Sequence, residues 1–341
     1  MSKIKFAVIG QGHIGKRHAE MVRRNPETEL VAVCDVLSKE KLGLNDLKEK
    51  FYTSAEELLK AHPEVEVVNV CTPNGLHAEH ALKILSSGRH AVIEKPMALH
   101  RQDCEQLISM ALQKHKQVFC VMQNRYSPPS VWMKEIVEKK ILGDIYMVQL
   151  NCYWNRDERY YTKGNWKGKQ DLDGGTLFTQ FSHWIDLLYW LFGDITDIQA
   201  KFADFNHSSL TDFEDSGFVN FRFVNGGLGS INYSTSVWDK NLESSITVMG
   251  SKGSVKVGGQ YMDKVENCHI KDYTMPSLSP TEPANDYGGY KGSANNHHFM
   301  IQNVIDTLKG KNTITTNALE GMKVVDIIER IYSFRKPSRK G

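Results

Sequence analysis

The sequence lacks several features that mark special classes of protein. Its six cysteines include no C-x-x-C pair, and several stand within apolar runs, as small buried side chains do. This pattern is typical of a protein that folds in a reducing compartment. The longest apolar stretch, residues 184–192, contains an aspartate and is too short to cross a bilayer. The net charge is only +2, so charge indicates neither a nucleic-acid nor a membrane partner.

Three further features that the sequence lacks bear on the location and the metal requirement of the protein. No secretory hydrophobic region stands near the start, no internal repeat is visible, and no group of residues has the spacing of metal ligands. We therefore expect a cytoplasmic protein that needs no metal. The chain of 341 residues is long enough for two domains with sizeable cores.

A glycine motif is the most informative feature that is present. An apolar run at residues 6–9 predicts a buried strand, and Gly10, Gly12 and Gly15 follow it in G-x-G-x-x-G spacing. Gly10 permits a tight turn from strand to helix, Gly12 lets a pyrophosphate approach the backbone, and Gly15 lets the helix pack closely on the strand. The N-terminus of that helix offers N–H groups and a partial positive charge to phosphates.

An acidic residue follows the glycine motif at the spacing found in dinucleotide-binding domains. A second apolar run, residues 30–34, ends on Asp35, twenty residues after Gly15. A carboxylate here can bind the ribose hydroxyls of a dinucleotide and repels a 2′-phosphate, which favours NAD over NADP. A glycine-rich turn in an ordinary α/β protein would not explain this acid. The predicted cofactor contacts in the segment are Gly10, Gly12, His13, Ile14, Gly15 and Asp35.

The hydrophobic pattern changes near residue 122. Before it, short apolar strands alternate with helical segments, which predicts a parallel, doubly wound sheet. After it, period-two segments dominate, and Asn225-Gly226 predicts a hairpin between two of them. We predict an α/β protein with an N-terminal Rossmann domain at 1–122 and a C-terminal α+β domain at 123–341, which has a largely antiparallel open sheet. Helices in the second part are expected near 131–139, 175–191, 296–309 and 318–334.

The tripeptide Glu94-Lys95-Pro96 offers a candidate base. It follows a predicted strand at residues 90–93. Ligands bind outside the carboxyl ends of the strands in a doubly wound sheet, so Lys95 should point into the nucleotide crevice. A lysine can act as a base only if its pKa falls from about 10.4 toward neutrality, and burial and an oxidised nicotinamide both lower it. A solvent-exposed lysine at a strand end is the structural alternative.

The helix expected near 175–191 carries a candidate proton-transfer group. Thr179, His183 and Asp186 share one face of this helix, and Asp173 stands before it as a plausible N-cap. A histidine on that polar face could exchange a proton with a sugar hydroxyl. A structural pairing of His183 with Asp186 is the alternative.

Together these motifs resemble one family. The glycine motif, Cys71-Thr72-Pro73-Asn74 with His77, Glu94-Lys95-Pro96 and the Gly-Gly helix with His183 are similar to those of the Gfo/Idh/MocA oxidoreductases. The resemblance implies that Lys95 and His183 face the substrate and the nicotinamide. Many members have an aspartate four residues before the histidine, where this chain has Thr179. Further cofactor contacts implied are Thr72, Pro73, Asn74, His77, Glu94, Lys95 and Gln123.

A narrower resemblance rests on five short segments of the second half. Residues 123–129, 154–156, 160–161, 171–175 and 180–183 are similar to motifs of UDP-N-acetylglucosaminuronate 3-dehydrogenases of bacterial O-antigen synthesis. Those enzymes oxidise the C3 hydroxyl of UDP-2-acetamido-2-deoxy-D-glucuronate. The resemblance implies NAD, a UDP-sugar and a homodimer or homotetramer. The predicted substrate contacts are Lys95, Asn124, Arg125, Tyr126, Trp154, Asn155, Arg156, Tyr160, Thr179, His183, Asn296 and His297.

The chemistry of these side chains suits such a substrate. Arg125 and Arg156 could form forked bonds to the diphosphate or carboxylate, and asparagines can bind hydroxyls or the acetamide. Each also has a structural alternative, since Trp154 and Tyr160 could simply fill a core. Two other functions stay open: a dehydrogenase of another sugar or inositol, and a catalytically silent NAD-binding regulator.

Overall fold

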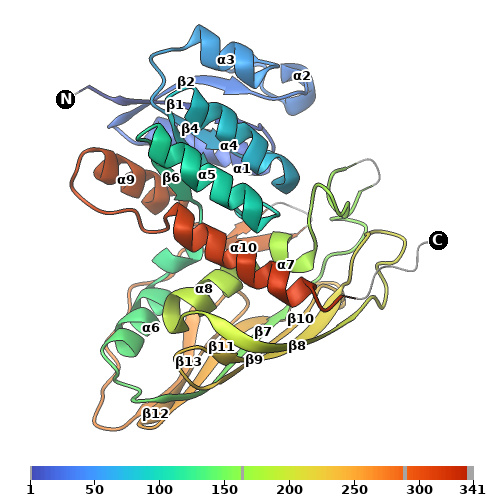
Figure 1. Cartoon of the computed structure of the whole chain (residues 1–341), viewed down its shortest axis with the longest axis vertical. Helices are drawn as coiled ribbons and strands as arrows, with labels where there is room; N and C mark the ends of the chain where they lie inside the picture. Colours follow the sequence, from blue (N-terminus) through green and yellow to red (C-terminus); the bar gives the residue numbers. More distant parts are fainter. Residues whose placement is uncertain (1, 163–164, 287–289, 336–341) are drawn as a thin grey trace. The chain divides into compact units, whose positions relative to one another are not determined.

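The computed structural model describes residues 2–162, 165–286 and 290–335 (Figure 1). The chain forms two compact units. Unit 1 contains Met1–Met122 and His297–Val325, and unit 2 contains Gln123–Asn296 and Asp326–Gly341. A division after residue 122 is therefore present. The segment His297–Val325 folds with unit 1, whereas the prediction assigned it to the second domain.

Unit 1 is built on a six-stranded parallel sheet with the strand order β3-β2-β1-β4-β5-β6. The order reverses between β1 and β4, which is where ligands bind in doubly wound sheets. Nearly all side chains of its central strands are buried, as in a sheet covered on both faces. The strands are Ile4–Ile9 (β1), Thr28–Cys34 (β2), Lys50–Tyr52 (β3), Val67–Val70 (β4), His90–Ile93 (β5) and Val118–Cys120 (β6).

Helices connect these strands, and one further helix returns from the end of the chain. The returning helix, α9, packs beside α1, where Asn25 Nδ2 donates to Gln302 Oε1 at 2.9 Å. The division between the units falls within the last helix, α10. The helices of unit 1 are His13–Arg24 (α1), Lys39–Leu42 (α2), Ala55–Ala61 (α3), the short 3₁₀ helix Asn74–Leu76 (η1), His77–Ser86 (α4), Arg101–Gln113 (α5) and His297–Leu308 (α9), and α10 is Ala318–Tyr332.

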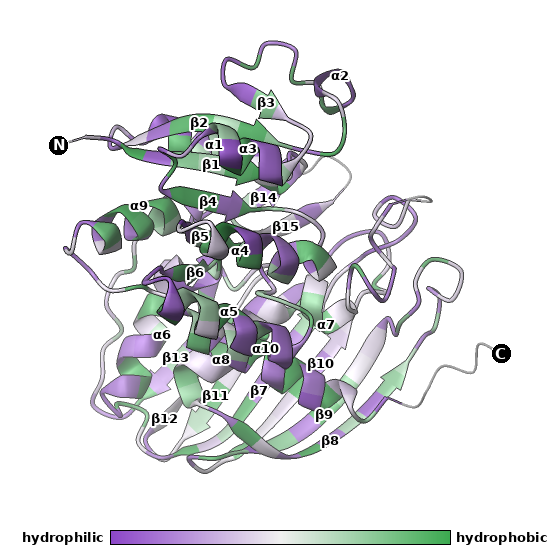
Figure 2. Ribbon diagram, turned by 45° about the horizontal axis from the view of Figure 1, so that its top comes forward, coloured by the Kyte–Doolittle hydropathy of each residue, from purple (hydrophilic) through white to green (hydrophobic). Residues whose placement is uncertain are grey.

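Unit 2 contains a seven-stranded sheet with the order β13-β12-β11-β7-β10-β9-β8, in which only β7 and β10 pair in parallel. Buried residues alternate with exposed residues along β9 and mostly with half-buried residues along β10, and Figure 2 colours the same sheet by hydropathy. One face of the sheet therefore packs on a core. The strands are Ile145–Tyr153 (β7), Ile195–Ala203 (β8), Ser216–Phe223 (β9), Leu228–Ser234 (β10), Glu243–Gly250 (β11), Gly253–Gly258 (β12) and Lys264–Ile270 (β13), with a separate pair Ala284–Asp286 (β14) and Lys291–Ala294 (β15).

The helices of unit 2 differ in one respect from the expectation. The single helix expected near 175–191 is two helices, Thr176–Thr179 (α7) and Ser182–Phe192 (α8), because the helix breaks at Gln180 and Phe181. Nine of the 11 residues of α8 are buried, so its polar side chains need partners. The short 3₁₀ helix Gln123–Tyr126 (η2) precedes Pro128–Glu138 (α6), where the prolines occupy the first helical turn.

The predicted fold class is confirmed. A parallel Rossmann sheet is followed by a largely antiparallel open sheet, and the predicted hairpin joins β9 to β10. Gly226 and Gly227 have φ values of +99° and +92° there, which suit glycine. Within the described ranges, no helix has both the length and the apolar character that spanning a membrane requires.

Candidate functional site

The glycine loop after β1 has the geometry of a dinucleotide-binding turn. Gly10 has a φ of +89°, and a Cβ there would overlap the Cys71 carbonyl. A Cβ at Gly15 would overlap the Gly10 carbonyl, so only glycine fits between α1 and the loop. A Cβ at Gly12 would meet no atom within 4 Å, which leaves open space beside the N-terminus of α1. A pyrophosphate binds at such a place, so the loop fits NAD.

Asp35 lies directly after β2, beside this loop. Its Oδ2 accepts the Gln11 N–H at 2.6 Å, and its Oδ1 accepts the Leu37 N–H at 2.9 Å. Two backbone groups thus fix the orientation of the carboxylate. Its contact with the ribose hydroxyls stays a prediction.

The loop after β4 carries Thr72, Pro73, Asn74 and His77. His77 Nδ1 lies 2.7 Å from the Pro96 carbonyl oxygen, and Nε2 lies 2.9 Å from that of Thr72. Burial lowers the pKa of His77, whereas the contacts with the two carbonyl oxygens raise it. The imidazole therefore ties this loop to the Lys95 turn.

Lys95 lies at the carboxyl end of β5, where the sequence analysis predicted it, and is half-buried. The Lys95–Pro96 peptide bond is cis. The Lys95 backbone N–H donates to Glu94 Oε2 at 3.1 Å. Lys95 belongs to unit 1 and His183 to unit 2, so their joint action stays a prediction.

Two buried amides at the start of unit 2 have unsatisfied polar atoms. Asn124 is 3% exposed, and neither of its amide atoms has a hydrogen-bond partner among the described residues. Gln123 donates to Ser293 Oγ at 3.1 Å, but its Oε1 has no such partner within the same ranges. An unpaired buried polar group costs about 1–3 kcal/mol, so both amides suit a polar ligand. Tyr126, at the end of η2, is half-buried.

Arg125 is paired inside unit 2. Its Nε donates to Asp186 Oδ2 at 2.8 Å and its Nη2 to Asp186 Oδ1 at 2.6 Å. The side chains of Arg125 and Asp186 are 0% and 1% exposed. Asp186 therefore pairs with Arg125, and its pairing with His183, the structural alternative considered from the sequence, stays a prediction.

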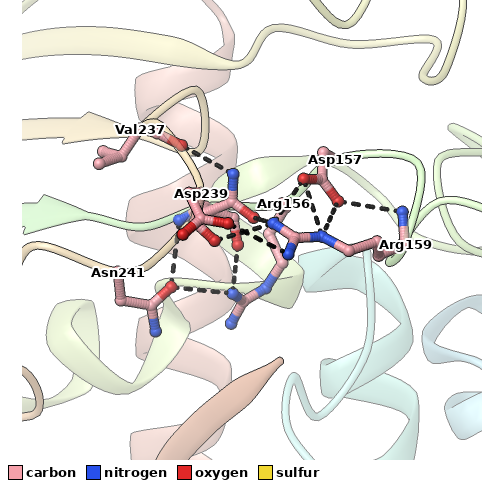
Figure 3. A network of polar contacts seen from close by, with 7 residues as sticks. Arg156, Asp157, Arg159, Val237, Asp239 and Asn241 are labelled. Atoms are coloured by element: carbon pink, nitrogen blue, oxygen red, sulfur yellow. Dashed lines mark hydrogen bonds and ion pairs between the residues drawn. The ribbon is translucent and has the colours of Figure 1, made fainter. Parts of the chain in front are cut away.

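Arg156 is also buried but has neutral partners (Figure 3). Among the described residues, no carboxylate lies within ion-pair distance of its guanidinium. Burial lowers the pKa of Arg156, and nearby aromatic rings compensate its charge in part. Its hydrogen bonds go to Gln180 Oε1 (2.8 Å), Asn155 O (2.6 Å), Asn241 Oδ1 (3.2 Å) and Lys291 O (3.1 Å). Counting only partners in the described part of the chain, these bonds leave one of its five N–H groups, on Nη2, for a ligand. The rings of Trp154, Tyr160 and Tyr290 lie 4.6, 5.2 and 5.2 Å from its Cζ.

The residues around Arg156 are largely engaged in packing. Trp154 Nε1 donates to Ser244 Oγ at 2.8 Å, and the Tyr160 hydroxyl accepts from Gln180 Nε2 at 2.8 Å. Asn155 Nδ2 donates to the Val237 carbonyl at 2.7 Å. At the surface beside them, Arg159 pairs with Asp157 and Asp239 (Figure 3).

His183 lies in the first turn of α8 and is 2% exposed. Its ring meets that of Trp184 edge-on at 6.2 Å. Thr179 donates its hydroxyl to Asp173. Burial raises the pKa of Asp173 to about 6, against the hydrogen bonds from Thr179 and Gly168.

Sequence reasoning missed the role of Asp173, since the N-cap of α7 is Gly175. Asp173 Oδ2 accepts the Gly168 N–H at 2.8 Å, and no sequence pattern links these residues. Asn296 donates to Gln123 O at 3.2 Å and to Ser127 Oγ at 3.0 Å, so it supports the Gln123 segment. His297 lies in unit 1, where Nε2 is 3.5 Å from Glu94 Oε1.

Comparison with known protein families shows to which family the chain belongs. Residues 4–122 match the oxidoreductase family with an NAD-binding Rossmann fold, and residues 131–256 match the GFO/IDH/MocA C-terminal domain. The chain belongs to the Gfo/Idh/MocA oxidoreductase family. Like other Gfo/Idh/MocA proteins, it is an NAD-dependent oxidoreductase.

Two solved structures of this family are similar over nearly their full length. The WlbA dehydrogenase from Bordetella pertussis, in complex with NADH and UDP-GlcNAcA, is 30% identical with a TM-score of 0.85 over 97% of this chain and 95% of that one. WlbA from Chromobacterium violaceum, with the same ligands, is 32% identical with a TM-score of 0.85 over 98% and 94%. Among curated relatives, the myo-inositol 2-dehydrogenase of Thermotoga maritima is 28% identical over 74% of each chain.

Proposed function

We propose that this protein uses NAD to oxidise the C3 hydroxyl of UDP-2-acetamido-2-deoxy-D-glucuronate, in the synthesis of a bacterial surface polysaccharide. The observation that carries the proposal is the full-length similarity to two WlbA dehydrogenases at 30% and 32% identity. Levoglucosan dehydrogenase, a solved structure of comparable coverage, is only 18% identical. The short segments around residues 123–129, 154–156 and 180–183 point to the same subgroup.

In this mechanism the protein moves one proton and positions the sugar. Lys95, at the ligand-binding edge of the parallel sheet, removes the proton of the C3 hydroxyl, and His183 orients that hydroxyl or relays the proton. NAD, when bound, accepts the hydride that C3 loses. The C–H and O–H bonds break as the C3 carbonyl forms, so the sugar is oxidised by two electrons.

The remaining polar groups recognise the substrate. Asn124 has two buried amide atoms without partners among the described residues, which suits a hydroxyl or the acetamide. With respect to the residues that the structure describes, Arg156 keeps one N–H for an anionic group, whereas Asp186 occupies the fork of Arg125. In our proposal Arg156 therefore contributes more to anion binding than Arg125 does.

The predicted homo-oligomer has some support from unit 2. Met147 pairs with Leu228 on one side and Met249 on the other, and all three are exposed on the sheet. Exposed apolar rows of this kind favour burial against a second copy.

Turnover with a defined sugar nucleotide tests the proposal. Purified protein and NAD are mixed with UDP-2-acetamido-2-deoxy-D-glucuronate, and NADH absorbance and product mass are followed. We expect NADH and a product lighter by two hydrogens, with far slower turnover of UDP-N-acetylglucosamine, which lacks the carboxylate. Equal rates with both sugars, or no product from either, would refute the assignment.

A dehydrogenase of a free polyol is the second candidate, because the myo-inositol 2-dehydrogenase of Thermotoga maritima is 28% identical to this chain. Such an enzyme needs no anion pocket. Turnover of myo-inositol that is faster than that of the sugar nucleotide, and insensitive to Arg156→Met, would favour it.

A further inference from the structure

A buried cluster of Glu94, His18 and His297 lies inside unit 1. These residues come from the end of β5, from α1 and from α9, and are far apart in the sequence. His18 Nε2 lies 2.8 Å from Glu94 Oε1, and His297 Nε2 lies 3.5 Å from the same oxygen. The three side chains are 0%, 7% and 0% exposed for His18, Glu94 and His297.

The geometry fits hydrogen bonding better than metal binding. Two histidines and a carboxylate are a common ligand set, and their candidate ligand atoms lie within 4.8 Å of one another. Metal bonds of 2.0–2.1 Å would hold tetrahedral ligand atoms about 3.3 Å apart. The 2.8 Å between His18 Nε2 and Glu94 Oε1 is instead a hydrogen-bond distance.

The carboxylate of this cluster is charged. Burial alone would favour the protonated acid, but His18 and His297 outweigh it and hold the pKa of Glu94 well below its usual range. Burial lowers the pKa of His297, whereas the neighbouring Glu94 raises it. His77 and Cys71 also face Glu94, and burial lowers the pKa of the first and raises that of the second. Arg17, from α1, is a charged neighbour that lowers the pKa of His297.

The second oxygen of this carboxylate reaches the backbone of Lys95. Glu94 Oε2 accepts the Lys95 N–H at 3.1 Å. On the other side of Lys95, the Pro96 carbonyl lies 2.7 Å from His77 Nδ1. The chain is thus held immediately before and immediately after Lys95, both times by a buried side chain.

We infer that Glu94 is a positioning residue for Lys95: its carboxylate, hydrogen-bonded to His18 and approached by His297, fixes the Lys95 backbone and tunes the basicity of the amine. This role gives His297 a function inside unit 1 in place of the substrate contact predicted from the sequence. The inference rests on the proposed function only in making Lys95 the base.

The variant Glu94→Gln tests the charge of the carboxylate apart from the size and hydrogen bonds of the side chain. The amide can accept the Lys95 N–H and donate to His18 Nε2, provided that His18 changes tautomer and donates from Nδ1 to Asn69. Asn69 Nδ2 now lies 2.9 Å from His18 Nδ1, and its Oδ1 has no partner among the described residues, so a turned amide accommodates the change. The variant therefore removes the buried negative charge while keeping the hydrogen bonds.

Competitive reductive methylation, followed peptide by peptide with mass spectrometry, reports the pH at which the Lys95 amine loses its proton. It needs no sugar, so it stays informative even if the proposed substrate is wrong. A neighbouring anion stabilises the protonated amine, so we expect Glu94→Gln to lower the Lys95 midpoint by about 0.5–1 pH unit. His297→Asn should shift it less, in the same direction, and exposed His298→Asn should leave it unchanged.

Two results of the methylation experiment would overturn the inference or a part of it. A Lys95 midpoint in Glu94→Gln equal to that of the wild type, in a variant with native thermal stability, would overturn the inference. An unchanged midpoint in His297→Asn would overturn the part assigned to His297. With a turned-over substrate in hand, Glu94→Gln should move the acid limb of the kcat profile to lower pH and leave KM nearly unchanged.

Discussion

Arg125→Met should destabilise unit 2 strongly, because it leaves a buried carboxylate without its partner. The Arg125–Asp186 pair is bidentate at 2.8 and 2.6 Å, and both side chains are shielded from water. Removing one partner of such a pair costs about 3–5 kcal/mol. For a domain of 150–250 residues, about 2–4 °C is lost per kcal/mol, so the melting temperature should fall by roughly 6–20 °C.

Thermal unfolding measures this loss, and tryptophan fluorescence reports the site directly, since Arg125 Cζ lies 5.3 Å from the Trp190 ring centroid. Asp186→Leu should cost a similar amount. The double variant Arg125→Met/Asp186→Leu replaces both charges with apolar groups and should recover most of the stability.

The outcome that refutes this reasoning is specific. If Arg125→Met melts within about 1 °C of the wild type while its KM for the sugar nucleotide rises strongly, the arginine binds substrate and the ion pair contributes little. Additive losses in the double variant would likewise contradict a coupled pair.

Three further predictions concern the cofactor loop and a buried acid. Gly12→Ala should keep the melting temperature but weaken NAD binding measured by NADH fluorescence, whereas Gly15→Ala should lower both, because its Cβ would overlap the Gly10 carbonyl. Asp35→Ser should raise the NADP-to-NAD ratio of kcat/KM by removing a charge that repels the 2′-phosphate. Burial raises the pKa of Asp173 from 3.8 to about 6, so the stability it contributes below about pH 4 is lost as pH rises through 6. That loss is about 3 kcal/mol, and Asp173→Asn should remove this pH dependence from chemical unfolding curves.

Local patterns predicted most of the fold because each reports a short-range constraint. The apolar runs that end before Gly10 and at Asp35 became β1 and β2, and Asn225-Gly226 became the hairpin between β9 and β10. The break between α7 and α8 was missed, since residues 175–191 keep helical periodicity through Gln180 and Phe181. The return of His297–Val325 to unit 1 was missed as well. Contacts between segments that are far apart in the sequence do not change the local hydrophobic periodicity from which the elements were predicted.

By itself, the sequence determined that a glycine loop, an acid and a lysine stand at the ends of parallel strands, because strand period and turn chemistry are local properties. Only the tertiary structure decided which side chains contact the buried charged groups. Asp186 pairs with Arg125, the Thr179 hydroxyl contacts Asp173, and Glu94 lies between His18 and His297. Burial makes an unpaired charge costly, so these partners are selected by proximity in the folded chain, which spacing along the sequence does not encode.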